Sequence, residues 1–334
     1  MYYNDYKVDK TKKYYKILCY DDDSYFRNEQ KFKEGLNICE NMYDEEDGSF
    51  IGLSFDDEDT VLSHIHSADL IADVKIPDDA LAFTYNSIYK YHASALILSN
   101  IREVKTVEAF RQFIKEGINV HTGGEICLKW ACEANKYDIA KLLVEDGADV
   151  NSNNGIHLSS AASSGNLDTV KLLIDYGAYM HFNNDFVLSS AAESGNIEMV
   201  KYFLNNGFDA NGNYGNPLRT SSANGFIDIV KLLISKGADV HAQDDISLIL
   251  AAQNGHFEVV KYLIEHGADI HSQDDSAVIA ASSFGHLGIV KYLVINGANI
   301  FAQDQCAIYA ASQYKQYHII DFIESIGLIY LNNY

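Results

Sequence analysis

The pattern of hydrophobic and polar residues in the second half of the chain predicts pairs of short helices. In residues 244–272, Leu248, Ala251 and Ala252 recur at helical spacing and indicate a first helix. A second helix follows at once. Its apolar face is formed by Phe257 and by the residues three, six and seven positions after it, which are Val260, Leu263 and Ile264.

Glycine ends each of these helices, because it adopts the left-handed conformation that closes a helix without steric cost. The glycines after the second helices stand thirty residues apart: Gly117, Gly147, Gly177, Gly207, Gly237, Gly267, Gly297 and Gly327. A series with the same step follows the first helices: Gly165, Gly195, Gly225, Gly255 and Gly285. The spacing predicts seven repeats in residues 118–327.

Each predicted helix pair is too short to be stable alone, since helices of about ten residues are marginal in water. The pairs must therefore bury their apolar faces against one another. Small residues occupy the positions where adjacent first helices would touch, among them Ala251, Ala252, Ala281 and Ser282. We therefore predict a mostly α-helical solenoid.

The segments "GFIDIVKLLISKGADVHA" and "GHFEVVKYLIEHGADIHS", with Pro217 and Leu218 in "NPLRTSSANG", resemble the ankyrin repeat. The period of thirty is shorter than the common ankyrin period of about 33 residues. The difference falls between the repeats, so we expect short connecting loops. These features, and the many Tyr, Asn, Ile and Asp residues, resemble the ankyrin proteins of giant amoeba-infecting viruses such as mimivirus. Residues 48–80 are similar to the segment ahead of their repeats.

Four regions follow from this pattern. Residues 1–95 lack the thirty-residue step, and we expect them to form a small, acidic α+β leader domain. Residues 96–117 are expected to form a degenerate capping half-repeat. The seven ankyrin-like repeats then occupy residues 118–327, and residues 328–334 form a C-terminal tail.

Within the leader, residues 50–55 and 69–76 read as strands, and the segment "DEDTVLSHIHS" between them has helical spacing. Pro77 ends the second strand because it lacks the N–H that a continuing ladder requires. Before residue 45 the pattern indicates no more than short helices.

A net charge of −22 argues against nucleic acid as a partner. Phosphate backbones are bound by clustered Lys and Arg, and the sequence contains no such cluster. Lysines do recur at thirty-residue spacing, at positions 141, 171, 201, 231, 261 and 291. Acidic residues three positions before most of them favour ordinary ion pairs on the helix surface.

The five cysteines include no Cys-x-x-Cys pair, so neither a disulfide framework nor a zinc ribbon is indicated. The first residues lack the apolar run of a signal peptide, and no stretch approaches the roughly 20 apolar residues of a membrane span. We expect a protein of the cytoplasm, and of the host-cell cytoplasm if it is viral.

Histidines supply the candidate metal ligands, but their spacing does not favour a site. His64 and His66 stand two apart, and residues two apart on a helix do not share a face. Another set recurs one repeat apart, too far for shared coordination: His121, His181, His241 and His271. Phosphate-loop, nucleophile-elbow and zinc-protease motifs are absent from the sequence. We predict no enzymatic activity, no cofactor and no metal site.

The candidate functional positions are the turns between repeats and the ends of the first helices, which vary while the rest of each repeat recurs. In a solenoid these positions line the concave binding face. The predicted partner-binding residues are Asn154, Asn184, Asp185, Tyr214, Asp244, Asp245, Asn254, Asp274, Asp275, Phe284 and Tyr314. Their acidic, amide and aromatic chemistry predicts a basic or polar protein segment as partner, of the host if the chain is viral.

The predicted function is a non-enzymatic scaffold for protein–protein interaction. One alternative, suggested by the resemblance, is an adaptor that recruits targets to a host ubiquitin ligase, although neither end contains a recognisable F-box-like segment. Another alternative is an enzymatic or nucleotide-binding leader domain, whose active-site residues could be scattered along the sequence.

Overall fold

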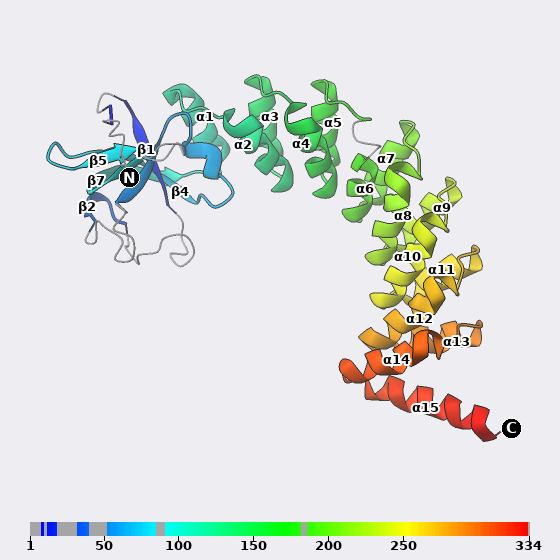
Figure 1. Cartoon of the computed structure of the whole chain (residues 1–334). Coiled ribbons are helices and arrows are strands. Elements are labelled where there is room, and N and C mark those ends of the chain that lie inside the picture. Colours follow the sequence, from blue (N-terminus) through cyan, green and yellow to red (C-terminus); the bar gives the residue numbers. More distant parts are fainter. Residues whose placement is uncertain are drawn as a thin grey trace. The chain divides into compact units, whose positions relative to one another are not determined.

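The computed structural model describes residues 8–9, 12–18, 32–39, 52–84, 91–181 and 186–332. These residues form a β-sheet followed by pairs of α-helices (Figure 1). The chain divides into two compact units: one contains residues 1–157 and 175–177, and the other contains residues 158–174 and 178–334.

The sheet is antiparallel, with its described strands in the order β2-β7-β4-β1-β3-β6-β5. The strands are β1 (Tyr14–Leu18), β2 (Gly35–Ile38), β3 (Leu53–Asp57), β4 (Leu70–Lys75), β5 (Ala82–Thr84), β6 (Tyr91–Ala93) and β7 (Ala95–Glu103). In its core the ring centroid of Tyr14 lies 5.1 Å from those of Phe55 and Tyr91. Leu96 and Leu98 of β7 are fully buried beside them.

The prediction for the leader is confirmed in its main features. The two predicted strands correspond to β3 and β4, and Pro77 follows the end of β4. Between them a short 3-10 helix, η1 (Val61–His64), forms where helical spacing was seen, and it buries Val61 and Leu62 completely. The suggestion of short helices before residue 45 is wrong for the described residues there, because they form β1 and β2.

The predicted boundary at residue 95 also differs from the structure. Residues 96–103, expected to begin a capping half-repeat, belong to β7, which pairs with β2 and β4 inside the sheet. Only the later part of that segment is helical, as α1 (Val107–Glu116). Alternating burial along β7 places Leu96 and Leu98 in the sheet core, and this non-local packing decides the conformation.

The repeats consist of a first and a second helix each. The first helices are α2 (Thr122–Glu133), α4 (Ser152–Ser163), α6 (Phe186–Glu193), α8 (Gly212–Ala223), α10 (Ala242–Gln253), α12 (Ser272–Phe284) and α14 (Ala302–Gln313). The second helices are α3 (Tyr137–Glu145), α5 (Leu167–Asp175), α7 (Ile197–Asn205), α9 (Ile227–Ser235), α11 (Phe257–Glu265), α13 (Leu287–Ile295) and α15 (Tyr317–Asn332). From α6 onward each first helix packs on the next first helix, as Figure 1 shows.

The small residues and glycines act as the sequence predicts. Ala251, Ala252 and Ala281 are fully buried where α10 and α12 meet. Gly255 has a φ of +82°, and a Cβ added to it would lie 2.6 Å from the ring of His286 in the next repeat. That ring lies 2.9 Å, through Nε2, from the carbonyl oxygen of Gln253. Gly255 is therefore required both by the turn and by the close approach of the next repeat.

The last helix is longer than expected. We predicted that the final repeat ends near Gly327 and that a tail follows, but α15 continues to Asn332. Its backbone remains helical through Gly327, so this glycine is not the terminator that its counterparts are.

The sheet packs against α1 and the start of the repeats within the first compact unit. Arg102 on β7 donates through Nη1 to Asp73 Oδ1 on β4 (2.8 Å) and through Nη2 to Glu116 Oε2 on α1 (2.7 Å). The ring of Phe110 on α1 stacks on Trp130 of α2 with centroids 6.2 Å apart. The backbone N–H of Asn119 donates to the carbonyl oxygen of Glu58 (2.8 Å). The sheet therefore covers the start of the repeats.

Candidate protein-binding surface

Consecutive repeats are joined by a turn of unusual backbone conformation. We define the inter-repeat turn as the nine residues that start at the glycine after a second helix, such as Gly237–Asp245. Its last three residues, Gln243, Asp244 and Asp245, fall within the bounds of α10 but are not α-helical, because their φ angles are 54°, 54° and 55°. The left-handed region is costly for most residues but tolerated by Asn, Asp and Gly, which dominate these positions. The turn is compact, in keeping with the shortened repeat.

The tips of successive turns are tied to one another. Gln243 Nε2 donates to the carbonyl oxygen of Tyr214 in the preceding turn (2.8 Å), and Gln273 Nε2 donates in the same way to Asp244 (3.0 Å). Gln303 Nε2 repeats the bond to Asp274 (3.0 Å). Tyr214, Asp244 and Asp274 thus have fixed backbones while their side chains point to solvent.

A second set of bonds joins the repeats deeper in the turns. In the turn that ends at Asp245, Asp245 Oδ1 accepts the backbone N–H of Asp269 in the next repeat (2.9 Å), and His241 Nδ1 lies 3.2 Å from the same oxygen. In the next turn Asp275 Oδ1 accepts the N–H of Asn299 (2.8 Å), with His271 Nδ1 3.0 Å away. We call this arrangement the His–carboxylate clasp.

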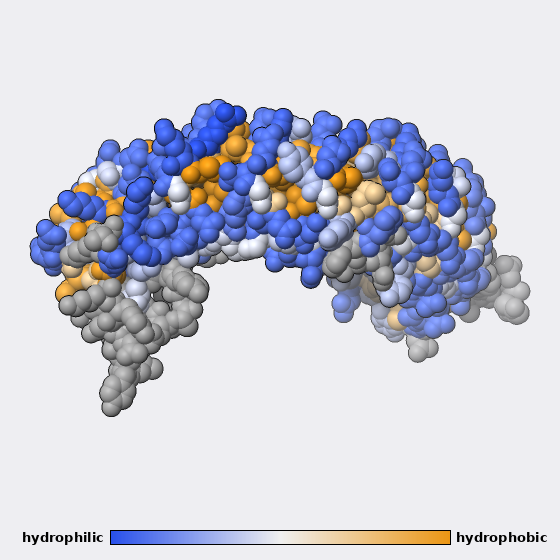
Figure 2. Space-filling view, turned by 90° about the horizontal axis from the view of Figure 1, so that it is seen from above, coloured by the Kyte–Doolittle hydropathy of each residue, from blue (hydrophilic) through white to orange (hydrophobic). Residues whose placement is uncertain are grey.

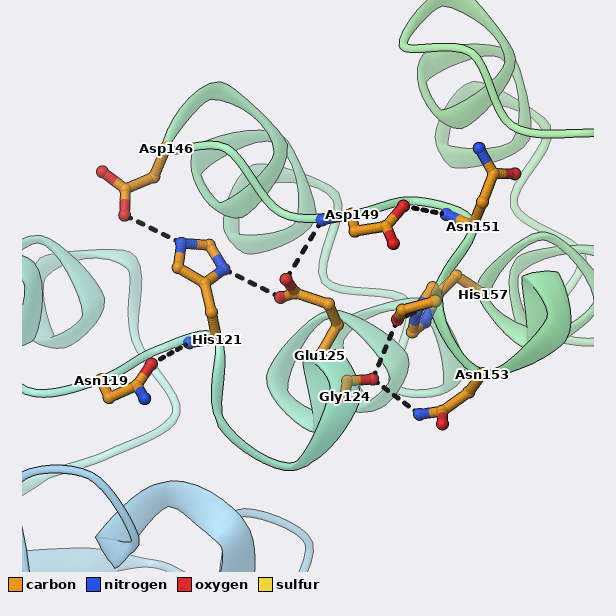
Figure 3. Close-up of polar contacts among 10 residues, drawn as sticks. Asn119, His121, Gly124, Glu125, Asp146, Asp149, Asn151, Asn153 and His157 are labelled. Atoms are coloured by element: carbon orange, nitrogen blue, oxygen red, sulfur yellow. Dashed lines mark hydrogen bonds and ion pairs between the residues drawn. The ribbon is translucent and has the colours of Figure 1, made fainter.

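The first clasp has an additional carboxylate. Figure 3 shows Glu125 between His121 and the backbone of Asp149, whose N–H donates to Glu125 Oε1 (3.1 Å). His121 Nδ1 lies 2.8 Å from Glu125 Oε2 and its Nε2 lies 3.2 Å from Asp146 Oδ2. Burial lowers the pKa of His121, but the bonds to Glu125 and Asp146 outweigh it and raise the pKa above the ordinary value.

Two turns use asparagine instead. Asn211 Oδ1 accepts the N–H of Asp239 in the next repeat (2.7 Å), and Asn211 Nδ2 donates to the carbonyl oxygen of Gly237 (2.9 Å). Asn151 Nδ2 makes the equivalent bond to Gly177 (2.9 Å). The last residue of these turns is glycine, Gly155 or Gly215. We call this arrangement the Asn–Gly clasp.

The structure separates the predicted partner-binding residues into three groups. Exposed residues are Asn154, Tyr214, Asp244, Asn254, Asp274, Phe284 and Tyr314. Asp245 and Asp275 are only 4% and 6% exposed, and their carboxylates serve the clasps, so they do not belong to the outer surface. Asn184 and Asp185 lie outside the described residues. Side-chain burial of a turn residue depends on the next repeat, which explains why the turn sequence alone did not separate Asp244 from Asp245.

Three of the predicted partner-binding residues are aromatic, and their side chains are exposed at two places of this surface. Tyr214 is 74% exposed at a turn tip, whereas Phe284 and Tyr314, 49% and 61% exposed, lie at the ends of α12 and α14. The rings of Phe284 and Tyr314 stack with centroids 5.9 Å apart. Large exposed aromatics at fixed positions are typical anchors of protein interfaces.

Charges are segregated between the two helix layers. The first helices α8, α10, α12 and α14 contain one basic residue, Arg219, whereas Lys201, Lys231, Lys261 and Lys291 all lie on second helices. Exposed acidic residues gather in the turns beside the first helices: Asp209, Asp239, Asp244, Asp269 and Asp274. The face drawn in Figure 2 is mostly hydrophilic, with smaller hydrophobic areas between the hydrophilic residues.

The lysines that recur every thirty residues make two kinds of contact. Lys201 Nζ lies 2.7 Å from Glu198 Oε1, as the predicted ion pairs require. Lys171, Lys231 and Lys291 instead lie over an aromatic ring of the next repeat; Lys231 Nζ, for example, is 5.8 Å from the ring centroid of Tyr262. These contacts connect adjacent second helices.

The described residues contain no group of three or more His, Cys, Asp and Glu side chains suited to a metal ion. His66 of the predicted pair lies 3.8 Å from Glu133 on α2. Over the same part of the chain, no helix has the length and apolar character needed to cross a membrane.

Comparison with known proteins identifies the helix pairs. The family model for ankyrin repeats in three copies matches residues 158–244 and 246–325, and that for ankyrin repeats in many copies matches residues 128–174. Together they cover more than half of the chain, which therefore belongs to the ankyrin repeat family.

Two individual proteins are similar to the chain. An ankyrin repeat protein of Acanthamoeba polyphaga mimivirus is 26% identical over 119 residues, which are 33% of this chain and 38% of that protein. The chain thus matches well under half the length of this viral relative. The crystal structure of the human ASB11 ankyrin repeat domain aligns with a TM-score of 0.46 and 22% identity, over 52% of this chain and 84% of the domain.

Proposed function

We propose that this chain is a non-enzymatic scaffold that binds a protein partner through the exposed side of its first helices and the tips of its inter-repeat turns. Ankyrin repeats are generally protein–protein interaction modules. Two observations carry the proposal. The recurring glutamines Gln243, Gln273 and Gln303 are engaged in bonds between repeats. Tyr214, Asp244 and Asp274 instead project to solvent from the same position of three successive turns.

The chemistry of this surface favours a basic segment as partner. Acidic side chains border α8, α10, α12 and α14, which contain a single basic residue, so a positively charged chain is attracted and a nucleic-acid backbone is repelled. Tyr214 and the stacked pair of Phe284 and Tyr314 supply aromatic faces for arginine or lysine side chains. We propose that this interaction takes place in the cytoplasm, with a host protein if the chain is viral.

The test is a selection of displayed peptides on the full chain, followed by calorimetry on the selected peptides. We expect peptides with net positive charge. The surface variant Tyr214→Ser/Asp244→Ser/Asp274→Ser/Phe284→Ser/Tyr314→Ser should weaken their binding at least tenfold, which is about 1.4 kcal/mol. The dissociation constant should also rise with salt, since exposed charges are screened.

The control carries comparable changes on second helices: Ile295→Ser, 83% exposed on α13, and Glu258→Ser on α11. It should bind the selected peptides as the unchanged chain does. Equal binding by the surface variant, or a preference for acidic peptides, would refute the assignment of this surface.

A further inference from the structure

The inter-repeat turns contain a correlation between two positions four residues apart. Wherever the fifth residue of the turn is histidine, the ninth is acidic: His121 with Glu125, His181 with Asp185, His241 with Asp245 and His271 with Asp275. Wherever the fifth is asparagine, the ninth is glycine: Asn151 with Gly155 and Asn211 with Gly215. The last turn, Gly297–Gln305, has neither pair: its fifth and ninth residues are Phe301 and Gln305, and α15 after it continues past Gly327 without a further turn of this kind.

The structure supplies the physical reason for this correlation. In four turns a side chain accepts the backbone N–H of the third residue of the next turn, which is Asp149, Asp239, Asp269 or Asn299. In the Asn–Gly clasp the asparagine amide accepts this N–H itself. In the His–carboxylate clasp the acceptor comes from the ninth residue, and the histidine holds that carboxylate in place.

Mixed pairs would leave polar groups without partners. A histidine followed by glycine lacks the carboxylate that accepts the next N–H, and loss of the acceptor at this partly buried contact is costly. An asparagine followed by aspartate places a second acceptor at the same N–H and leaves a nearly buried carboxylate without its imidazole. Glycine in the ninth position of the turn at Gly215 also leaves room for the next repeat, because a Cβ there would lie 2.6 Å from Ala242 Cβ.

We propose that, in the six turns followed by another turn, the fifth and ninth residues act as one exchangeable unit that couples a repeat to the next, and that the His–carboxylate and Asn–Gly pairs are two equivalent forms of it. Asp245 and Asp275 are then positioning residues: they hold the turns from which Asp244 and Asp274 project. This inference is independent of the proposed partner, since it concerns the coupling of repeats in the unbound chain.

A double-mutant cycle in the full chain tests the proposal at His241 and Asp245. Asp245→Gly should lower the urea midpoint of unfolding and accelerate hydrogen exchange of the Asp269 amide. His241→Asn should also lower the midpoint. The double variant His241→Asn/Asp245→Gly creates the pair found at Asn211 and Gly215, so it should recover most of the lost midpoint and restore protection of the Asp269 amide.

The matched control is Asp244→Gly, which makes the same chemical change at the neighbouring left-handed residue, whose carboxylate is exposed. It should leave the exchange of the Asp269 amide unchanged. If the double variant loses as much as the two single variants added together, the two positions act separately and the proposal is wrong. If a single variant does not fold, the comparison of the double variant with the unchanged chain decides: a folded double variant with a protected Asp269 amide supports the exchange, and an unfolded one refutes it.

Discussion

At the scale of single residues, two histidines of the first compact unit, His121 and His157, respond to acid in opposite ways. His121 is held by Glu125 and Asp146, which raise its pKa, so it stabilises the fold below its ordinary pKa of about 6.5 and loses that contribution as pH rises through the higher folded value. His157 is 0% exposed, and burial lowers its pKa to about 4. Its Nε2 lies 2.8 Å from Ser152 Oγ, while its Nδ1 has no hydrogen-bond partner among the described residues.

His157 should therefore make the protein sensitive to acid. The unfolded chain binds a proton near pH 6.5 and the folded chain near pH 4, so the free energy of unfolding falls as pH drops through this window, by about 3 kcal/mol in all. Val187 occupies the same position one repeat later. We expect His157→Val to change stability by no more than about 1 kcal/mol at pH 7, the net value of one hydrogen bond, and to be more stable than the unchanged chain at pH 4.5.

Urea unfolding at the two pH values measures this difference. His266→Gln, a change of the exposed histidine at the C-terminal end of α11, serves as the control and should keep the pH dependence of the unchanged chain. A His157→Val variant that loses stability with acid as steeply as the unchanged chain would show that His157 is not the sensitive group.

At the scale of elements, Arg102 connects three of them: β7, which carries it, β4 through Asp73 and α1 through Glu116. Its side chain is 18% exposed, so solvent screens these ion pairs only partly. Its guanidinium carbon also lies 5.9 Å from the ring centroid of Phe113. The fork of an arginine can bond two carboxylates at once, which a lysine ammonium does with less geometric definition.

We expect Arg102→Met to destabilise the protein by about 2–3 kcal/mol, because it removes two charge-assisted hydrogen bonds and leaves the partly buried carboxylate of Glu116 with the Gln112 amide but no cation. Arg102→Lys should recover part of the loss. Arg219→Met on α8 is the control, since Arg219 bonds through Nε to Asn216 within its own helix. Equal losses in urea unfolding of the Arg102 and Arg219 variants would argue against the special role of Arg102.

At the scale of the whole molecule, the repeats are coupled mainly to their neighbours, so a change at one end is expected to stay local. The sheet buries Val61, Leu62 and Leu98 and bonds to α1 and to the turn at Asn119. In a solenoid the first repeat needs such a cover over its apolar side. The sheet therefore caps the first repeat.

Removal of residues 1–103 should accelerate hydrogen exchange in α1, which would lose the contacts of Arg102 with Phe113 and Glu116, and in α2, which packs on η1. Exchange in α10–α13 should stay unchanged. Exchange measured by mass spectrometry along the full and shortened chains distinguishes the two regions. A uniform increase along all helices would mean that the repeats unfold as one cooperative block, contrary to local coupling.

The sequence by itself determined the period of thirty, the ends of most helices and the small residues at their contacts. These features obey local rules, namely helical spacing and glycine conformation, and repetition makes them visible. It also contained the pairing of histidine with acid and of asparagine with glycine, which our sequence interpretation missed because it considered each position separately.

Tertiary structure alone decided the rest. The strands β1, β2 and β7 form because distant segments pair, as Tyr14 does with Val74, and short apolar runs do not reveal such partners. Asp244 and Asp245 are adjacent identical residues with the same backbone conformation, yet one faces solvent and the other lies 2.9 Å from the N–H of Asp269. Which carboxylate is free for a partner depends on the position of the next repeat, and that position exists only in the folded stack.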